Sequence, residues 1–180
     1  MASSTCTPVR VSPPSVPQAE GREVDRDRAR EILLRALDAA GLVVEDVGDN
    51  RWMTMLSGQW KRTIPVMLDL GERTLRLTSL FCAAPDQGHE EVYRILLTRN
   101  QRTPMVHFAL DDVGDVVLTG AIGLDALDEG AVDQLLGAVL VIADETYNQV
   151  LRAGFADYIA HEQGWRAANE LPPNPVSDAP

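Results

Sequence analysis

Apolar side chains recur along the chain with two different periods, and the changes of period mark the expected elements. From residue 25 to residue 40 they recur every three to four positions, which predicts an amphipathic helix. Asp25 suits the N-cap of this helix, and Gly41 suits the position after its last turn. Its apolar face comprises Ala29, Leu33, Ala36, Leu37 and Ala40.

From residue 52 the period changes to two, which is typical of strands that bury one face. Three such stretches occupy residues 52–56, 60–70 and 75–81, and short turns at residues 57–59 and 71–72 separate them. Short connections of this kind favour antiparallel pairing. We therefore expect three consecutive antiparallel strands.

The second half of the chain repeats this alternation of helix and strand. A helix is expected over residues 89–99, followed by a hairpin with arms at 105–110 and 116–121, and then a long helix over 129–155. The long helix has an apolar stripe of Val132, Leu136, Val139, Leu140, Ala143, Tyr147 and Val150. The order α-β-β-β-α-β-β-α predicts an α+β fold with an antiparallel sheet, rather than a doubly wound one.

Both ends of the chain differ from its middle in composition. Residues 1–22 contain four prolines, several Ser and Thr and little to bury, and residues 169–180 are similar, so disordered tails are expected. The 180-residue length suits one domain, assigned to residues 23–168. The first 22 residues lack a signal-peptide apolar segment and no stretch is apolar enough to span a bilayer, so a cytoplasmic protein is expected.

The net charge of −11 is concentrated in the last third of the chain. Residues 1–110 carry 14 basic and 14 acidic side chains, whereas residues 111–180 carry 2 and 13. Nucleic acids and anionic membranes both require clustered Lys and Arg. The acidic composition therefore argues against nucleic-acid and membrane partners.

The sequence offers no recognisable catalytic, cofactor or metal site. Its three histidines have no partners at ligand spacing, and no P-loop, dinucleotide or Gly-x-Ser-x-Gly motif occurs. Two cysteines are too few for a disulfide framework or a four-cysteine zinc site, and Cys82 is expected to be a small buried apolar residue. A non-enzymatic protein without cofactor or metal is expected, since no nucleophile–base pair can be named.

The acidic cluster Asp111, Asp112 and Asp115 is the strongest candidate for a cation site. A twelve-residue calcium loop that starts at Asp111 would end on Ile122, where a bidentate acid is needed. Asp and Gly also suit a hairpin turn, which is the expected role of residues 111–115. A small-molecule or metal-responsive regulator that uses this turn remains the alternative function. The acidic residues at 125–133 are expected to favour the start of the long helix.

Two helices carry more apolar residues than one core-facing stripe requires. On the middle helix, Tyr93 and Leu97 lie beside the stripe of residues 92, 95 and 96; on the last helix, Leu135 and Ile142 widen the stripe to about half the circumference. We take these four residues as a candidate self-association or partner surface, because monomers rarely expose large apolar patches. The alternative is that the sheet and the other helix bury them.

Several short segments resemble the bacterial YbjN-domain proteins, which in turn resemble class I type III secretion chaperones in fold. The segments are residues 81–85 (FCAAP), 92–97 (VYRILL), Asn100, 108–115 (FALDDVGD), 132–140 (VDQLLGAVL), 143–147 (ADETY) and 154–155 (GF). The resemblance covers about residues 26–155 and implies the same element order, a homodimer, no known active site, and action as a peptide-binding chaperone or regulatory adaptor on an unidentified protein client. Asn100 itself is explained locally, as a residue that ends the middle helix in the left-handed conformation.

Overall fold

The computed structural model describes residues 19–173, with side chains from residue 26. The elements follow in the order α1 (Ala19–Ala39), β1 (Val44–Gly48), β2 (Arg51–Leu56), β3 (Ile64–Leu70), β4 (Thr74–Cys82), α2 (His89–Asn100), β5 (Val106–Leu110), β6 (Val116–Gly123), the short 3-10 helix η1 (Leu124–Ala126), α3 (Glu129–Gly154) and α4 (Ala156–Ala168). This confirms the α+β class and the predicted order, to which the structure adds β1 and α4.

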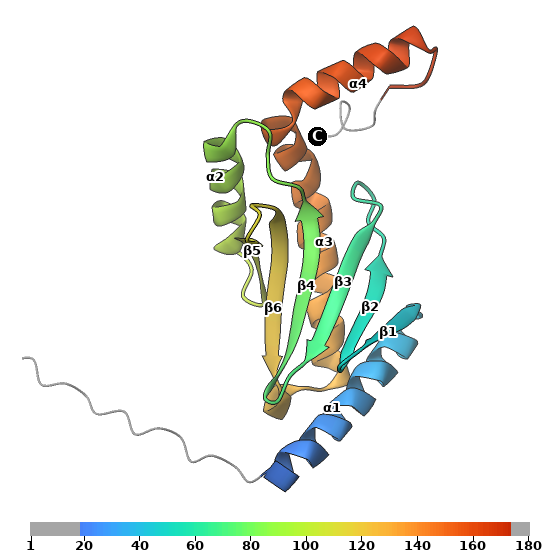
Figure 1. The fold of residues 1–180 in the computed structure, drawn as a ribbon, viewed down its shortest axis with the longest axis vertical. Coiled ribbons are helices and arrows are strands. Elements are labelled where there is room, and N and C mark those ends of the chain that lie inside the picture. The colour runs from blue at the N-terminus through green and yellow to red at the C-terminus, as the bar shows by residue number, and fades with distance from the viewer. Residues whose placement is uncertain (1–18, 174–180) are drawn as a thin grey trace, which may run out of the picture.

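One antiparallel sheet of six strands organises the fold, in the order β1-β2-β3-β4-β6-β5. Helices α1 and α3 lie behind the sheet in Figure 1, and no helix of residues 19–173 crosses the opposite face. The strands alternate accordingly between core and surface, since successive side chains point to opposite faces. The core positions of the two central strands are Ile64, Val66, Leu68, Leu70, Leu75, Leu77, Ser79 and Phe81.

Strand β1 was not predicted because it has almost no buried face. Only Val44 is half-buried, and the other four residues of the strand are exposed. It pairs with β2 through a tight turn in which Asp49 and Asn50 adopt positive φ angles of 53° and 59°. Asp and Asn are among the few residues that tolerate this conformation. The sequence Gly-Asp-Asn was therefore the only local signal for the strand.

The long helix α3 is the centre of the helical layer, as expected. The side chain of Asp128 caps it by accepting a hydrogen bond of 2.7 Å from the backbone N–H of Ala131, which confirms a capping role for the acidic start. The helix contacts the sheet, α1 and α2 along its length. It therefore buries more of its circumference than a helix that covers a sheet alone.

Two of the four candidate surface residues, Leu135 and Ile142, lie in the core. Leu135 is fully buried and Ile142 is 7% exposed. Leu135 packs directly on the backbone of β6 at Gly120, which has no side chain. A Cβ atom on Gly120 would lie only 2.9 Å from the Leu135 Cδ1 atom. The wide stripe thus reflects packing on several elements, which corrects the expectation that it forms a surface.

The C-terminal part of the chain is also more structured than expected. Helix α4 projects from the end of α3 (Figure 1) and has no fully buried residue. After it, the chain folds back, and the Arg166 guanidinium donates a hydrogen bond to the Pro172 carbonyl. Helix α1 begins at Ala19, within the predicted tail; residues 1–18 and 174–180 of the two predicted tails lie outside the described residues. Within the described part of the chain, no helix combines the length and the apolar character needed to cross a bilayer.

Candidate interaction surfaces

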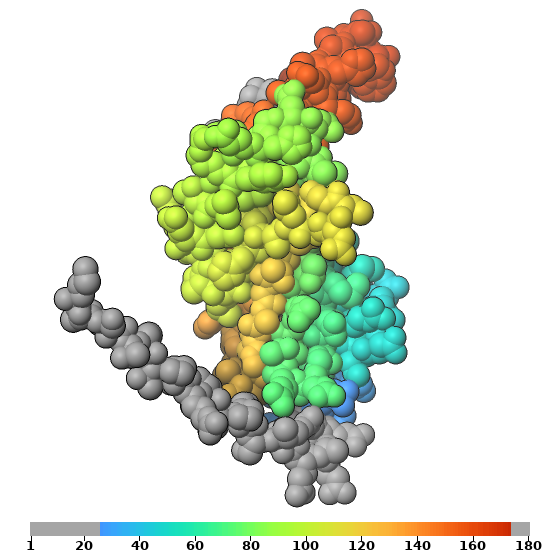
Figure 2. Space-filling view, turned by 60° about the vertical axis from the view of Figure 1, so that its left-hand side comes forward, coloured from blue at the N-terminus to red at the C-terminus, as the bar shows by residue number. Residues whose placement is uncertain are grey.

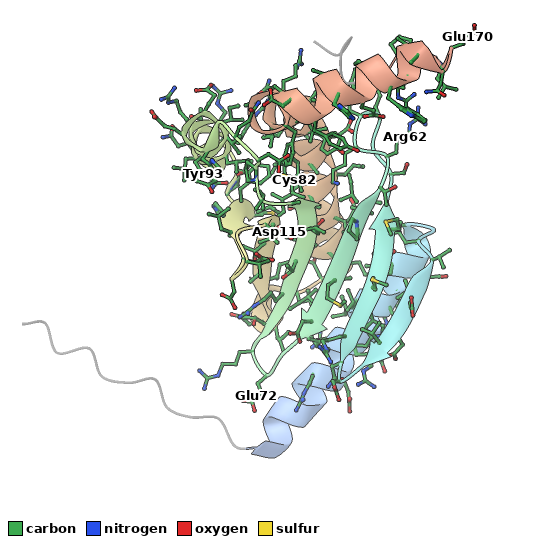
Figure 3. The ribbon with its side chains drawn as sticks, turned by 45° about the horizontal axis from the view of Figure 1, so that its top comes forward. Arg62, Glu72, Cys82, Tyr93, Asp115 and Glu170 are labelled. Atoms are coloured by element: carbon green, nitrogen blue, oxygen red, sulfur yellow. The ribbon has the colours of Figure 1, made fainter. Side chains whose placement is uncertain are left out.

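The structure separates the four candidate surface residues into core and surface. On α2, Val92 and Leu96 are buried, whereas Leu97 is 64% exposed and Tyr93 is half-buried beside the His89 ring. Figure 2 shows α2 as the yellow-green part of the molecular surface, and Figure 3 shows where Tyr93 lies on it. Leu97 therefore lies on the surface, and Tyr93 beside it packs partly against the core; we call these two residues the α2 patch.

The face of the sheet that carries no helix forms a second apolar surface. Met53, Met67, Thr78, Thr119 and His107 are successive register partners across five strands. In the neighbouring row, Met55 pairs with Pro65, and Leu80 pairs with Val117. Met55 and Leu80 are 49% and 47% exposed, and the others named here except His107 are half-buried. We call Met53, Met55, Met67, Leu80 and Val117 the open face. The sequence did not predict this surface, because the strand order that brings these residues together was not predicted.

The outer edge of β5 is closed by the side chain of Asn100. Its Nδ2 donates a hydrogen bond of 3.1 Å to the Phe108 carbonyl, and its Oδ1 accepts one of 2.7 Å from the Phe108 N–H. Asn100 does not have a positive φ, so the expected left-handed helix end is wrong. The Asn100 amide instead binds the Phe108 N–H and carbonyl as a neighbouring strand would. These two groups are then not free to pair with another chain.

The acidic turn uses its carboxylates for its own backbone. Asp111 Oδ1 accepts hydrogen bonds from the N–H groups of Val113 and Asp115, and Gly114 has a φ of +92°. Asp115 Oδ1 accepts a further bond from the Ala84 N–H. Among the described residues, no group of three or more His, Cys, Asp or Glu is placed to hold a metal ion. The hairpin-turn role is thus confirmed by direct contacts.

A partly buried polar cluster lies where β4, α3 and the loop of residues 57–63 meet. The Lys61 Nζ is 4.9 Å from the ring centre of Tyr147 and 5.9 Å from that of Phe81. Burial lowers the pKa of Lys61 and raises that of Tyr147. Burial also raises the pKa of Cys82 (Figure 3) to about 12, against the smaller opposing effect of Lys61. The Cys82 thiol therefore stays protonated at neutral pH and is a poor nucleophile.

We expect Cys82 to react slowly with iodoacetamide as long as the protein is folded. Because the thiolate is the reactive form, a thiol with a pKa near 12 should be alkylated at least tenfold more slowly at pH 8.5 than an exposed cysteine. The rate should continue to rise with pH above 9. Mass spectrometry of digested protein separates Cys82 from Cys6, and alkylation in urea supplies the reference rate. Equal rates in folded and unfolded protein would contradict the burial argument.

Two solved structures with a similar fold are complexes of two proteins. One is the ExsC–ExsE complex, with a TM-score of 0.53, 20% identity, and coverage of 69% of this chain and 95% of the matched chain. Another is the HopA1–SchA chaperone–effector complex, with a TM-score of 0.53, 13% identity, and coverage of 73% and 98%. At these identities the likeness establishes the fold.

Relatives at higher identity are uncharacterized mycobacterial proteins. A protein of Mycobacterium tuberculosis is 41% identical over 111 residues, which span 62% of this chain and 61% of that protein's length. A protein of Mycobacterium leprae is 34% identical over 143 residues, which span 77% of this chain and 78% of that protein. The family profile named YbjN, described as a putative bacterial sensory transduction regulator, matches residues 29–152. The match runs from the middle of α1 almost to the end of α3, and the chain belongs to the YbjN family.

Proposed function

We propose that this chain is a non-enzymatic domain that binds a protein or peptide, as a chaperone or regulatory adaptor. The observation that carries the proposal is the open face, an apolar surface that no helix of the described residues covers. A role of this kind is supported by the similarity in fold to proteins solved in complex with protein partners, including a chaperone–effector pair. The acidic turn carries no competing proposal, because Asp111 already binds the backbone of the hairpin and Asp115 binds the Ala84 N–H.

The composition of the open face suits a variable peptide ligand. Three of its five residues are methionines, whose unbranched side chains adopt several shapes at low cost. Surfaces rich in methionine repack around different partners, which favours a binder with several clients over one with a single fixed ligand. The apolar side chains also lie in adjacent rows, so an extended peptide that crosses the strands contacts several of them at once.

We expect the double substitution Met55→Glu with Leu80→Glu to weaken peptide binding strongly without unfolding the domain. Both side chains are about half exposed, so charge is tolerated at these positions in the free protein. In a complex the two carboxylates are buried without partners, which should weaken binding at least tenfold. The measurement is fluorescence anisotropy with labelled peptides selected from a random library on the wild-type protein. Leu110→Glu is the matched control, because Leu110 is 49% exposed but lies off the open face.

Two results would contradict the open-face assignment. One is a selection that yields no peptide above background. The other is a double variant that binds the selected peptides as tightly as the Leu110→Glu control does.

We further propose that the protein is a homodimer that pairs through the α2 patch. In a symmetric dimer the same residues of both copies meet, so Tyr93 and Leu97 of one helix would contact their counterparts. Among the large apolar residues of the described helices, Leu97 and Tyr158 have the highest exposed fraction, 64% each. Large apolar residues that cluster on a surface often mark interfaces. The partner helix would cover the α2 patch while the open face stays free for the client.

We expect Tyr93→Glu with Leu97→Glu to convert the dimer into a folded monomer. Each substitution acts twice across a symmetric interface and buries like charges against each other. Light scattering coupled to size exclusion gives the mass, and circular dichroism reports the fold. Val113→Glu, at an exposed turn position, is the control that should stay dimeric. A monomeric wild-type protein, a variant that remains dimeric or one that unfolds would each contradict the proposed interface.

A further inference from the structure

A cleft of about 550 Å³ lies between α4, the C-terminal end of α3 and the loop of residues 57–63. Four aromatic side chains line it, namely Trp60, Tyr147, Phe155 and Tyr158. This volume and this predominantly apolar lining are typical of sites for small organic molecules. The α4 side of the cleft lies beyond residue 152, where the match to the YbjN family ends.

The loop side of the cleft is held in a fixed position by α3. The Asp144 Oδ1 atom accepts hydrogen bonds of 2.7 Å and 2.8 Å from the backbone N–H groups of Trp60 and Lys61. A Cβ atom on Gly58 would lie 2.3 Å from the same oxygen, so glycine is required for this close approach. The loop side of the cleft is therefore formed before a ligand arrives, which lowers the entropic cost of binding.

Asn148 places an amide without a partner in the wall of the cleft. The residue is only 5% exposed and lines the cleft from α3. Its backbone carbonyl accepts a bond from Arg152, but no hydrogen bond joins its side-chain amide to another described residue. The amide atoms are accessible to solvent from the cleft, since the buried side-chain polar atoms without a partner among the described residues are Ser79 Oγ and Thr146 Oγ1. A ligand with a polar ring atom would satisfy this group.

Two charged side chains line the cleft, Arg62 and Glu162, and the positive one is better placed to bind a ligand. Arg62 lies on the loop beneath α4 (Figure 3) and makes no ion pair with a carboxylate of the described residues. Glu162, the acidic residue on the opposite wall, is already paired with Arg166 at 2.9 Å. An anionic ligand therefore gains an interaction at Arg62 that a cationic one does not.

We propose that this cleft binds a small aromatic carboxylic acid. The ring lies among the four aromatic side chains, a polar ring atom hydrogen-bonds with the Asn148 amide, and the carboxylate pairs with Arg62. Edge-to-face and stacked arrangements of rings give such a site its preference for planar ligands. The site is separate from the open face and from the α2 patch, so it stands independently of the proposed peptide binding.

The test uses a series of related ligands on the full-length protein, measured by isothermal titration calorimetry. Indole-3-acetate has all three features; indole lacks the carboxylate, tryptamine carries a positive charge instead, and 1-naphthaleneacetate lacks the ring N–H. We expect saturable binding of indole-3-acetate, with indole and tryptamine at least tenfold weaker, the loss expected for one charge-assisted hydrogen bond. The naphthalene analogue should be weaker than indole-3-acetate, which tests Asn148 without altering the protein.

Variants then assign the contacts to residues. Arg62→Gln should reduce the affinity for indole-3-acetate about tenfold and leave that for indole unchanged, because only the carboxylate loses its partner. Tyr158→Ala should weaken every ligand of the series, and Tyr158 is 64% exposed, so the fold should persist. Arg76→Gln is the control, since Arg76 is exposed on β4, away from the cleft. Absence of saturable binding up to about 5 mM, equal binding of tryptamine, or full affinity in both cleft variants would overturn the proposal.

Discussion

Replacing Gly120 with alanine should destabilise the domain by about 1–3 kcal/mol, although the change adds a single methyl group. Gly120 is buried in β6, between Leu77 of β4 and Val106 of β5. A Cβ atom at this position would lie 2.7 Å from the Met105 carbonyl oxygen and 2.9 Å from Leu135 Cδ1. The Met105 carbonyl belongs to the backbone and cannot rotate away. Either β5 or α3 therefore has to shift.

A second glycine gives the matched control for this measurement. Gly137 lies on the exposed side of α3, and a Cβ atom there would meet no atom within 4 Å. Gly137→Ala should therefore stabilise the protein by about 0.5–1 kcal/mol, the usual gain for alanine within a helix. Urea denaturation of the two variants gives both free energies of unfolding. A Gly120→Ala variant as stable as the wild type would show that Leu135 does not pack on β6 as described.

The same contact explains why Leu135 was misplaced from the sequence. Periodicity reports which residues share a helix face, but it does not report how many neighbours that helix has. Because α3 packs against the sheet and two other helices, Leu135 and Ile142 belong to the core even though they widen the stripe. On α2 the same argument placed Tyr93 and Leu97 beside the buried stripe, and there the structure leaves Leu97 exposed.

Alternation of apolar and polar residues predicts a strand only where one face of that strand is buried. In β3 every second residue, from Ile64 to Leu70, is buried, and the strand was predicted from that pattern. β1 packs almost nothing against the core, so its exposed Glu45 and Asp46 gave no such pattern. Strand β1 is held to β2 by the backbone pairing and by a hydrogen bond from the Thr54 hydroxyl to the Val43 carbonyl. The period of apolar residues does not report these bonds.

The cleft was beyond prediction from the sequence because its parts are distant along the chain. Trp60 and Arg62 were predicted to lie in a strand over residues 60–70, but that strand begins only at Ile64 and both residues lie in the loop before it. Tyr158 comes from a helix that was not predicted. The carboxylate of Asp144 on α3 holds this loop in place by accepting hydrogen bonds from backbone N–H groups more than 80 positions earlier in the chain. No local pattern encodes a contact of that span, whereas the open face follows directly once the strand order is known.

Replacing Asn100 with alanine should both destabilise the protein and promote its self-association. The substitution removes two hydrogen bonds from the Phe108 backbone, at a cost of about 1–3 kcal/mol. It also frees the outer edge of β5, and an unpaired strand edge is a template for pairing with another chain. Gln101→Ala, one residue further along and exposed, is the control. Thermal unfolding measures the loss of stability, and light scattering during incubation below the melting temperature measures the association.

Asn100→Asp separates the hydrogen bonds from the shape of the side chain. The carboxylate still accepts a bond from the Phe108 N–H, but its second oxygen faces the Phe108 carbonyl, and the C-terminal end of α2 also disfavours negative charge. Both effects raise the pKa of the new carboxyl above the ordinary value of about 3.9. Once protonated, the group donates to the Phe108 carbonyl and restores both bonds. The stability deficit of this variant should therefore be largest at neutral pH and shrink as the pH falls through the raised pKa. A deficit that is independent of pH, or absent from both variants, would mean that Asn100 does not close the edge of β5.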